Sequence, residues 1–152
     1  MSLLWAVVPV LIVGGCPSQN RQQGVGTSAS TQQSLYVRLG GIESLRPLVD
    51  EWMLEVTSDK HIRDFFAQSD ISKLKLRILE KICVLADGPC LYQGRGMYSV
   101  HAQIKLDDTH LQRFLVGLDA AMTRVSIEPA AAAELRERVR DVAAQIAVSS
   151  DS

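Results

Sequence analysis

The chain is poor in aromatic residues and in net charge, and each shortage removes a class of function. Aromatic side chains make up 5% of 152 residues, which leaves few faces on which nucleic-acid bases could stack. The formal net charge is −1, so the chain has no basic footprint, and we expect no nucleic-acid partner. The sequence also lacks a Cys-x-x-Cys site, a catalytic carboxylate pair, a phosphate-binding loop and any alternating strand pattern. What remains is an apolar content of 47%, ample for the core of one all-α domain.

The amino end is almost wholly apolar over residues 1–15. This run is shorter than the roughly 20 residues that a membrane-spanning helix needs, and it ends on small residues, as a signal peptide does. The ending Val13-Gly14-Gly15-Cys16 resembles the lipobox of bacterial lipoproteins, in which the cysteine becomes the lipidated first residue. We therefore expect an exported protein anchored to a membrane through lipid on Cys16, facing the periplasm or the cell exterior. Because no lysine or arginine precedes the run, a misplaced start codon or an uncleaved tail in a cytoplasmic protein is the alternative.

Residues 16–34 follow as a flexible polar tether, rich in Ser, Gln, Gly and Thr, which cannot bury enough apolar surface to fold. Two further cysteines, Cys83 and Cys90, lie close together in sequence near a predicted helix end. In an exported protein they could form a disulfide. Alternatively, Cys83 is a small buried apolar residue and Cys90 is a loop thiol. The sequence leaves both interpretations open.

From Ser44 onward, apolar residues recur at spacings of three and four, which predicts amphipathic helices and no strands. The inward stripes are Leu48, Val49, Trp52, Met53 and Val56; Ile71, Leu74, Ile78, Ile82 and Leu85; Leu111, Phe114, Leu115, Leu118 and Met122; and Leu135, Val139, Val142 and Ile146. Helix starts are predicted at Ser44 with Pro47 in the first turn, at Ser69 or Asp70, at Asp107 or Asp108, and at Pro129. The simplest reading of these stripes is the core of a helical bundle.

A turn-rich segment begins at Gly88-Pro89, where the preceding helix should stop, and leads to a histidine on an apolar face. His101 lies four residues after Met97 and three before Ile104, so all three point the same way in a helix. A histidine in such a place is more often a core residue bonded to a backbone carbonyl. Its ring nitrogen is also a candidate ligand for iron. His61 and His110 are isolated and are expected at the surface.

The order of signals along the chain is more specific than any one of them. It resembles the group I truncated haemoglobins, the two-over-two globins, over residues 35–148. The residues that carry the resemblance are Leu35-Tyr36-Val37-Arg38-Leu39-Gly40-Gly41, Phe65-Phe66, Leu74-Lys75, Gly88-Pro89, Tyr92-Gln93-Gly94, Met97 and His101. The resemblance implies an all-α truncated globin fold around a pocket for haem b, with His101 as the proximal iron ligand.

The resemblance also implies roles for residues around the haem. Phe66 corresponds to the phenylalanine that packs on the haem plane, Met97 lies beside His101 on the same face, and Arg77 and Tyr92 are candidates for contact with the propionates. Trp52-Met53 falls where the family commonly has Phe-Tyr, and Leu74 and Ile78 lie at the distal positions, the second of which is commonly glutamine. Met53 and Ile78 cannot donate a hydrogen bond, so we expect a distal pocket lined by Met53, Leu74 and Ile78 that is unusually apolar.

These expectations favour reversible binding of a diatomic gas, with oxygen as the first candidate and nitric oxide or carbon monoxide as the alternatives, and with fast release of oxygen. An enzymatic alternative is nitric oxide dioxygenation, which needs a reductase that the sequence does not name. A third alternative, from another class, is a globin-like sensor or structural lipoprotein without haem.

Overall fold

The computed structural model describes residues 33–147, in which six α-helices and one 3-10 helix form a single packed unit without strands. The elements are α1 (Leu35–Arg38), α2 (Gly41–Ser58), η1 (Arg63–Phe66), α3 (Ile71–Leu85), α4 (Met97–His101), α5 (Asp108–Arg124) and α6 (Pro129–Ala147). The predictions for the signal peptide, for Cys16 and for most of the tether lie outside the described residues. Within them, no helix is both long and apolar enough to cross a membrane.

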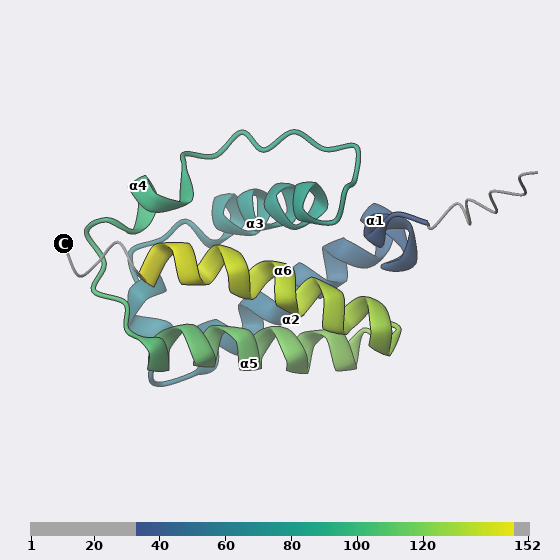
Figure 1. Cartoon of the computed structure of the whole chain (residues 1–152). Helices are drawn as coiled ribbons and strands as arrows, with labels where there is room; N and C mark the ends of the chain where they lie inside the picture. The colour runs from purple at the N-terminus through teal and green to yellow at the C-terminus, as the bar shows by residue number, and fades with distance from the viewer. Residues whose placement is uncertain (1–32, 148–152) are drawn as a thin grey trace, which may run out of the picture. The chain divides into compact units, whose positions relative to one another are not determined.

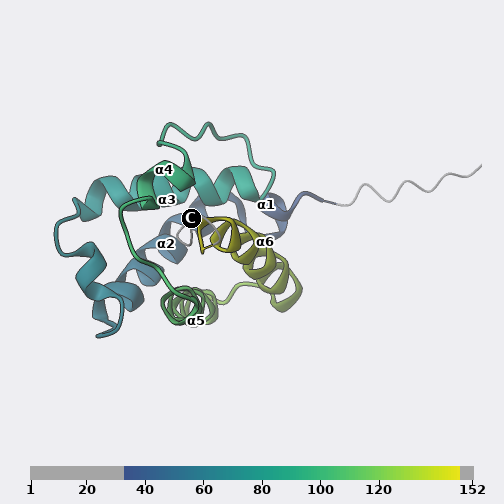
Figure 2. The ribbon, with the colours of Figure 1, turned by 60° about the vertical axis from the view of Figure 1, so that its left-hand side comes forward.

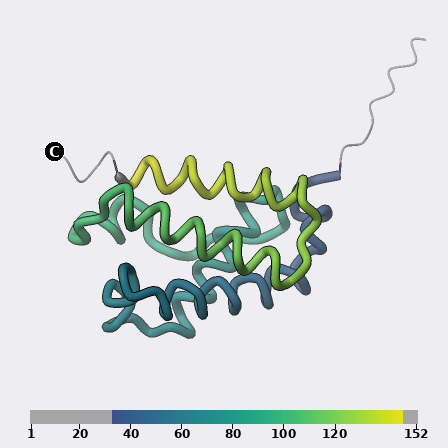
Figure 3. The backbone as a smooth tube through the Cα atoms, turned by 90° about the horizontal axis from the view of Figure 1, so that it is seen from below, coloured from purple at the N-terminus to yellow at the C-terminus, as the bar shows by residue number. Residues whose placement is uncertain are grey.

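The four long helices pack as two pairs, α2 with α3 and α5 with α6 (Figure 1). The two pairs are joined because α2 also packs on α5, and α3 on α6. Figure 2 shows α5 almost end-on, with α6 beside it. Seen from below in Figure 3, α5 lies between α2 and α6. This arrangement confirms the all-α class that the sequence predicted, with two helix pairs packed on each other.

The apolar stripes meet in one core, as amphipathic helices require. Leu48 and Trp52 of α2, Leu118 of α5 and Leu135 of α6 are at most 2% exposed. The described residues contain no buried polar or charged side chain, so burial of apolar surface dominates the stabilisation of this core.

Three predicted helix starts are confirmed. The side chain of Asp70 accepts a hydrogen bond from the Lys73 amide and caps α3. Asp107 caps α5 in the same way, by accepting from the His110 amide at 3.0 Å. Pro129 is the first residue of α6, where its missing N–H is not needed.

The start of α2 differs from the prediction. The helix begins at Gly41 rather than at Ser44, so Pro47 lies in its interior and not in its first turn. The reason is that Gly40 and Gly41 adopt φ values of +88° and +68°, a left-handed bend that lets a short helix, α1, precede α2. The Tyr36 hydroxyl then accepts a hydrogen bond from the Ile42 amide at 3.0 Å. The capping role expected of Ser44 is therefore wrong.

The end of α3 is tied to the segment that follows it. Cys83 and Cys90 form a disulfide, which decides between the two interpretations that the sequence left open. The Gly88 amide donates to the Cys83 carbonyl at 2.8 Å, after Asp87 with a φ of +60°. From there residues 86–96 run back alongside α3 without helical structure and lead to α4, as Figure 1 shows.

Candidate haem pocket

A cavity of about 630 Å³ lies between the helices, a size typical of small-molecule and cofactor sites. All the elements from α2 to α6, together with the segment between α3 and α4, contribute to its wall. Its lining includes Trp52, Phe65, Phe66, Leu74, Ile78, Tyr92, Met97, His101, Phe114 and Val142. The wall is therefore mainly apolar, with one imidazole from the short helix α4.

The cavity brings together all but one of the residues that the sequence singled out for cofactor binding. Those that line it are Phe66, Leu74, Arg77, Ile78, Tyr92, Met97 and His101. Met53 does not. It is buried in the core at 1% exposure, and the neighbouring Trp52 lines the cavity instead. Successive helical residues point about 100° apart, so Trp52 and Met53 do not share a direction, and the placement of Met53 in the distal wall is corrected.

Trp52 brings an N–H to this wall, but that donor is engaged. Its Nε1 donates to the Phe114 carbonyl at 3.0 Å, and the two rings lie 4.5 Å apart between centroids. The indole thus joins α2 to α5 and presents an apolar ring surface to the cavity. Its single donor is satisfied inside the protein.

The ring of His101 has a defined orientation. Its Nδ1 lies 2.7 Å from the carbonyl oxygen of Met97, one helical turn earlier in α4. A carbonyl can only accept, so Nδ1 carries the proton and donates it to Met97. In the neutral ring, Nε2 then keeps its lone pair. A histidine oriented through its other nitrogen in this way is the usual arrangement of a metal-ligating imidazole.

Four cationic side chains line part of the cavity, namely those of Lys73, Arg77, Lys81 and Arg95. No described lining residue is acidic. Arg77 is held by Glu80, whose two carboxylate oxygens lie 2.9 and 2.7 Å from Nη1. The Gln93 amide also donates to Glu80, at 3.0 Å, and this bond, together with Arg77, lowers the pKa of Glu80.

Tyr92 lies at the same part of the cavity. Lys81 Nζ is 5.2 Å from the centre of its ring, a cation–π contact, and its hydroxyl donates to the Arg95 carbonyl at 2.9 Å. Burial raises the pKa of the Tyr92 hydroxyl, so this hydroxyl stays protonated and remains a donor at neutral pH.

His110 is a lining residue that the sequence analysis placed at the surface. It lies in the first turn of α5, where its Nδ1 accepts from the Asp107 amide at 3.2 Å and completes a capping box. Its ring meets Phe65 edge-on, at 4.9 Å between centroids. The Asp-x-x-His spacing at a helix start was the available signal, because a capping side chain folds back along the first turn. His61, in contrast, is exposed as expected.

The residues present fit a haem. The cavity offers an imidazole whose Nε2 lone pair is available for iron and a mainly apolar wall for the macrocycle. Lys73, Arg77, Lys81 and Arg95 would complement the two propionates without any opposing carboxylate in the described lining.

Comparison with known proteins agrees with this geometry. Residues 34–148 match the family model described as bacterial-like globin. The group 1 truncated hemoglobin GlbN of Mycolicibacterium paratuberculosis is 26% identical over 114 residues, which cover 75% of this chain and 84% of the relative. The group 1 truncated hemoglobin of Tetrahymena pyriformis is 24% identical over 98 residues, or 64% of this chain and 81% of that protein.

Solved structures are similar in fold. The truncated hemoglobin of Tetrahymena pyriformis in its Fe(III) form superposes with a TM-score of 0.72 at 21% identity and covers 75% of this chain and 97% of its own. A Synechococcus 2/2 hemoglobin with covalently attached heme gives a TM-score of 0.71 at 20% identity, covering 76% and 99%. With most of its length matched by the family model, the chain belongs to the bacterial-like globin family and is a haem-binding globin of the two-over-two fold.

Proposed function

We propose that this globin holds haem b through His101 and binds a diatomic gas reversibly. The observation that carries the proposal is the oriented imidazole, with Nδ1 donating to the Met97 carbonyl, in the wall of a mainly apolar cavity. Haem supplies the iron that takes up the gas. The protein's part is to hold the cofactor, exclude water from it and set the polarity around it.

Each part of the cavity has its task in this proposal. His101 supplies Nε2 as the proximal ligand, and Met97 fixes the ring that carries it. Phe66 packs against the macrocycle from η1. Arg77 and Tyr92 lie on the side of the cavity that takes the haem propionates.

Reconstitution of the apoprotein with hemin tests the ligand. We expect the wild-type chain to develop a Soret band, and His101→Ala to lose it or shift it strongly, because the iron would lose Nε2 as its ligand. His61→Ala is the matched control, since His61 is exposed and does not line the cavity, and its spectrum should equal that of the wild type. Absence of hemin uptake by the wild type would instead favour the haemless alternative, and an unchanged spectrum in His101→Ala would exclude this histidine as the ligand.

We further propose that oxygen leaves the ferrous protein quickly. Leu74 and Ile78 cannot donate, the Trp52 N–H is engaged by Phe114, and Arg77 is held by Glu80. A hydrogen bond with a charged partner contributes about 1.5–3 kcal/mol, so its absence corresponds to release roughly ten- to a hundredfold faster.

Stopped-flow measurement of oxygen dissociation tests the apolar-wall proposal. We expect a fast phase that Arg77→Ala and His110→Phe leave unchanged, because neither side chain then contributes a donor to the gas. Slow dissociation in the wild type would contradict the proposal. If one of the two variants restored fast release, it would identify the donor that the wall contains.

The location of the protein is a separate proposal. We propose that it is exported and anchored through lipid on Cys16, as the lipobox-like Val13-Gly14-Gly15-Cys16 suggests. The Cys83–Cys90 disulfide supports export, since such bonds persist mainly in oxidising compartments. The wild-type chain should incorporate labelled palmitate and fractionate with membranes, whereas the Cys16→Ser chain should remain unlabelled. A wild-type chain found unlabelled in the cytoplasm with Met1 intact would refute the proposal and leave the haem site unaffected.

A further inference from the structure

The segment between α3 and α4 is fastened to α3 at several points within little more than one helical turn. We define this strap as residues 86–96. Cys90 is bonded to Cys83, the Gln93 amide donates to Glu80, and the Tyr92 ring lies under the Lys81 ammonium. The strap therefore runs antiparallel to the end of α3, and its first tie is the only covalent one among the described residues.

The strap also forms part of the haem pocket. Tyr92, Gln93, Gly94 and Arg95 line the cavity, and α4 with His101 begins directly after the strap. α4 is only five residues long and packs chiefly on α6. A helix this short has little stability of its own, so the position of His101 depends on what holds the strap in place.

The two cysteines differ in access to solvent. Cys83 is fully buried at 0% exposure, whereas Cys90 is partly exposed. Of the two residues, Cys90 is therefore the one that a thiolate reagent in solvent can approach. Beyond Cys90, the ties between the strap and α3 are an exposed hydrogen bond and a cation–π contact, both weak at a protein surface. The Gly88 amide, which donates to the Cys83 carbonyl, holds only the first residues of the strap.

From these observations we propose that the Cys83–Cys90 disulfide is a redox-reactive site for dithiol reductants, and that its reduction frees the strap and weakens retention of haem at His101. The inference rests on the proposed function in its second half only, because release of the strap does not require haem.

The chemistry balances as a two-electron exchange. A thiolate of the dithiol attacks Cys90 Sγ, the S–S bond breaks, and Cys83 leaves as a thiolate that takes up a proton. The second thiolate of the reductant then attacks the reductant sulfur that is bonded to Cys90 in the mixed disulfide. This step releases Cys90 as a thiolate, which is protonated in turn. The reductant ends as a disulfide and the protein as two thiols.

The test compares the oxidised and the dithiothreitol-reduced full-length chain, both carrying Cys16→Ser so that only the pair reacts. A Cys83→Ala/Cys90→Ser variant mimics the reduced state. We expect hydrogen exchange in residues 88–97 of the apoprotein to accelerate at least ~10-fold on reduction, and haem transfer to excess apomyoglobin to accelerate by a similar factor. The variant should match the reduced chain and should not respond to dithiothreitol.

The possible outcomes separate the two halves. Unchanged exchange and unchanged haem transfer after reduction, with two free thiols counted, would overturn the inference. Faster exchange with unchanged haem transfer would overturn the link to the pocket. If the wild-type chain took up no hemin, the proposed function would fail, and the exchange data would still decide whether the disulfide restrains the strap. A disulfide that dithiothreitol leaves intact in the folded chain would overturn its assignment as a reactive site.

Discussion

At the scale of single residues, the distal wall is decided by which of two neighbours faces the cavity. Trp52 and Met53 are both almost fully buried, at 2% and 1% exposure, yet only Trp52 lines the cavity. The indole presents an apolar ring surface to the cavity, and its N–H donates to the Phe114 carbonyl. At this position the wall therefore lacks a free hydrogen-bond donor, because the Trp52 N–H points to the Phe114 carbonyl.

Restoring a donor should slow the release of oxygen. In Ile78→Gln, an amide on α3 replaces an alkyl group of similar length at a position that lines the cavity. We expect oxygen dissociation to slow by about ten- to a hundredfold, because a hydrogen bond of about 1.5–3 kcal/mol becomes available. Leu76→Gln is the matched control on the same helix, since Leu76 is 48% exposed and does not line the cavity. Equal rates in both variants would show that position 78 does not face the gas.

At the scale of the helices, the crossing of α2 and α5 depends on a residue without a side chain. Gly117 is buried, and a Cβ placed on it would lie 3.1 Å from Val56 Cγ1 and 3.5 Å from Trp52 Cδ1. The two helices can therefore approach closely. The crossing also sets where the Trp52 ring lies relative to the cavity.

A branched side chain at position 117 should separate the two helices. We expect Gly117→Val to destabilise the protein by about 1–3 kcal/mol, as overpacking of a dense core does, measured by urea unfolding of the apoprotein. Val116→Ala is the control at the adjacent position, which is 54% exposed, and it should change the unfolding free energy by less than about 0.5 kcal/mol. If Gly117→Val retained full stability, the close crossing would not restrict the core.

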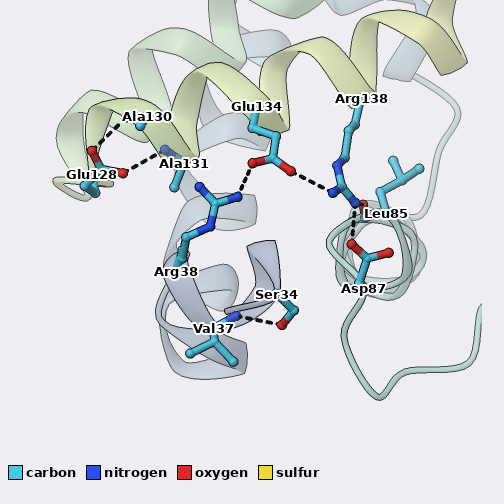
Figure 4. A network of polar contacts seen from close by, with 10 residues as sticks. All are labelled: Ser34, Val37, Arg38, Leu85, Asp87, Glu128, Ala130, Ala131, Glu134 and Arg138. Carbon is cyan, nitrogen blue, oxygen red and sulfur yellow. Dashed lines mark hydrogen bonds and ion pairs between the residues drawn. The ribbon is translucent and has the colours of Figure 1, made fainter. Parts of the chain in front are cut away.

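At the scale of the whole domain, a network of ion pairs and hydrogen bonds joins α1, the end of α3 and α6 (Figure 4). Glu134 of α6 pairs with Arg38 of α1 and, at 2.7 Å, with Arg138 one turn further along α6. Arg138 also donates to the carbonyl of Leu85, the last residue of α3, at 2.5 Å, and to the carboxylate of Asp87 just after it, at 2.7 Å. Glu128 accepts the amides of Ala130 and Ala131 at the start of α6. These contacts position α6 against the end of α3 and the first residues of the strap.

The network predicts a pH dependence of stability. Arg38 first, and then Arg138, lower the pKa of Glu134 below its ordinary value of 4.5 in the folded chain. The unfolded chain therefore binds a proton at a higher pH than the folded one, so the contribution of Glu134 is present above pH 4.5 and is lost as the pH falls through the lowered pKa.

Glu134→Gln should accordingly unfold at a lower urea concentration than the wild type at pH 7, and the difference should shrink as the pH falls below 4.5. Glu137→Gln is the control, because Glu137 lies on the same helix and, among the described residues, pairs with Arg140 alone at the exposed surface. A Glu134→Gln difference that stayed constant over this pH range would show that ionisation of the carboxylate is not what stabilises the network.

The sequence by itself determined the helices and seven of the residues that line the pocket. Periodicity of three and four is a local property, so the stripes, the caps at Asp70 and Asp107 and the position of Pro129 were predictable from neighbours in the chain. The order of Phe66, Leu74, Met97 and His101 likewise indicated the globin fold, because each of these residues marks a fixed place along a known succession of helices.

Only the tertiary structure decided the remaining features, since they depend on contacts between residues far apart in the sequence or on backbone angles that composition does not specify. The left-handed Gly40-Gly41 bend moved the start of α2, and helix rotation against α5 turned Trp52 rather than Met53 to the cavity. The fold-back of His110 at its helix start put a ring into the wall. The Cys83–Cys90 bond was open in sequence because two nearby cysteines pair only when the chain reverses between them, as it does at Asp87 and Gly88.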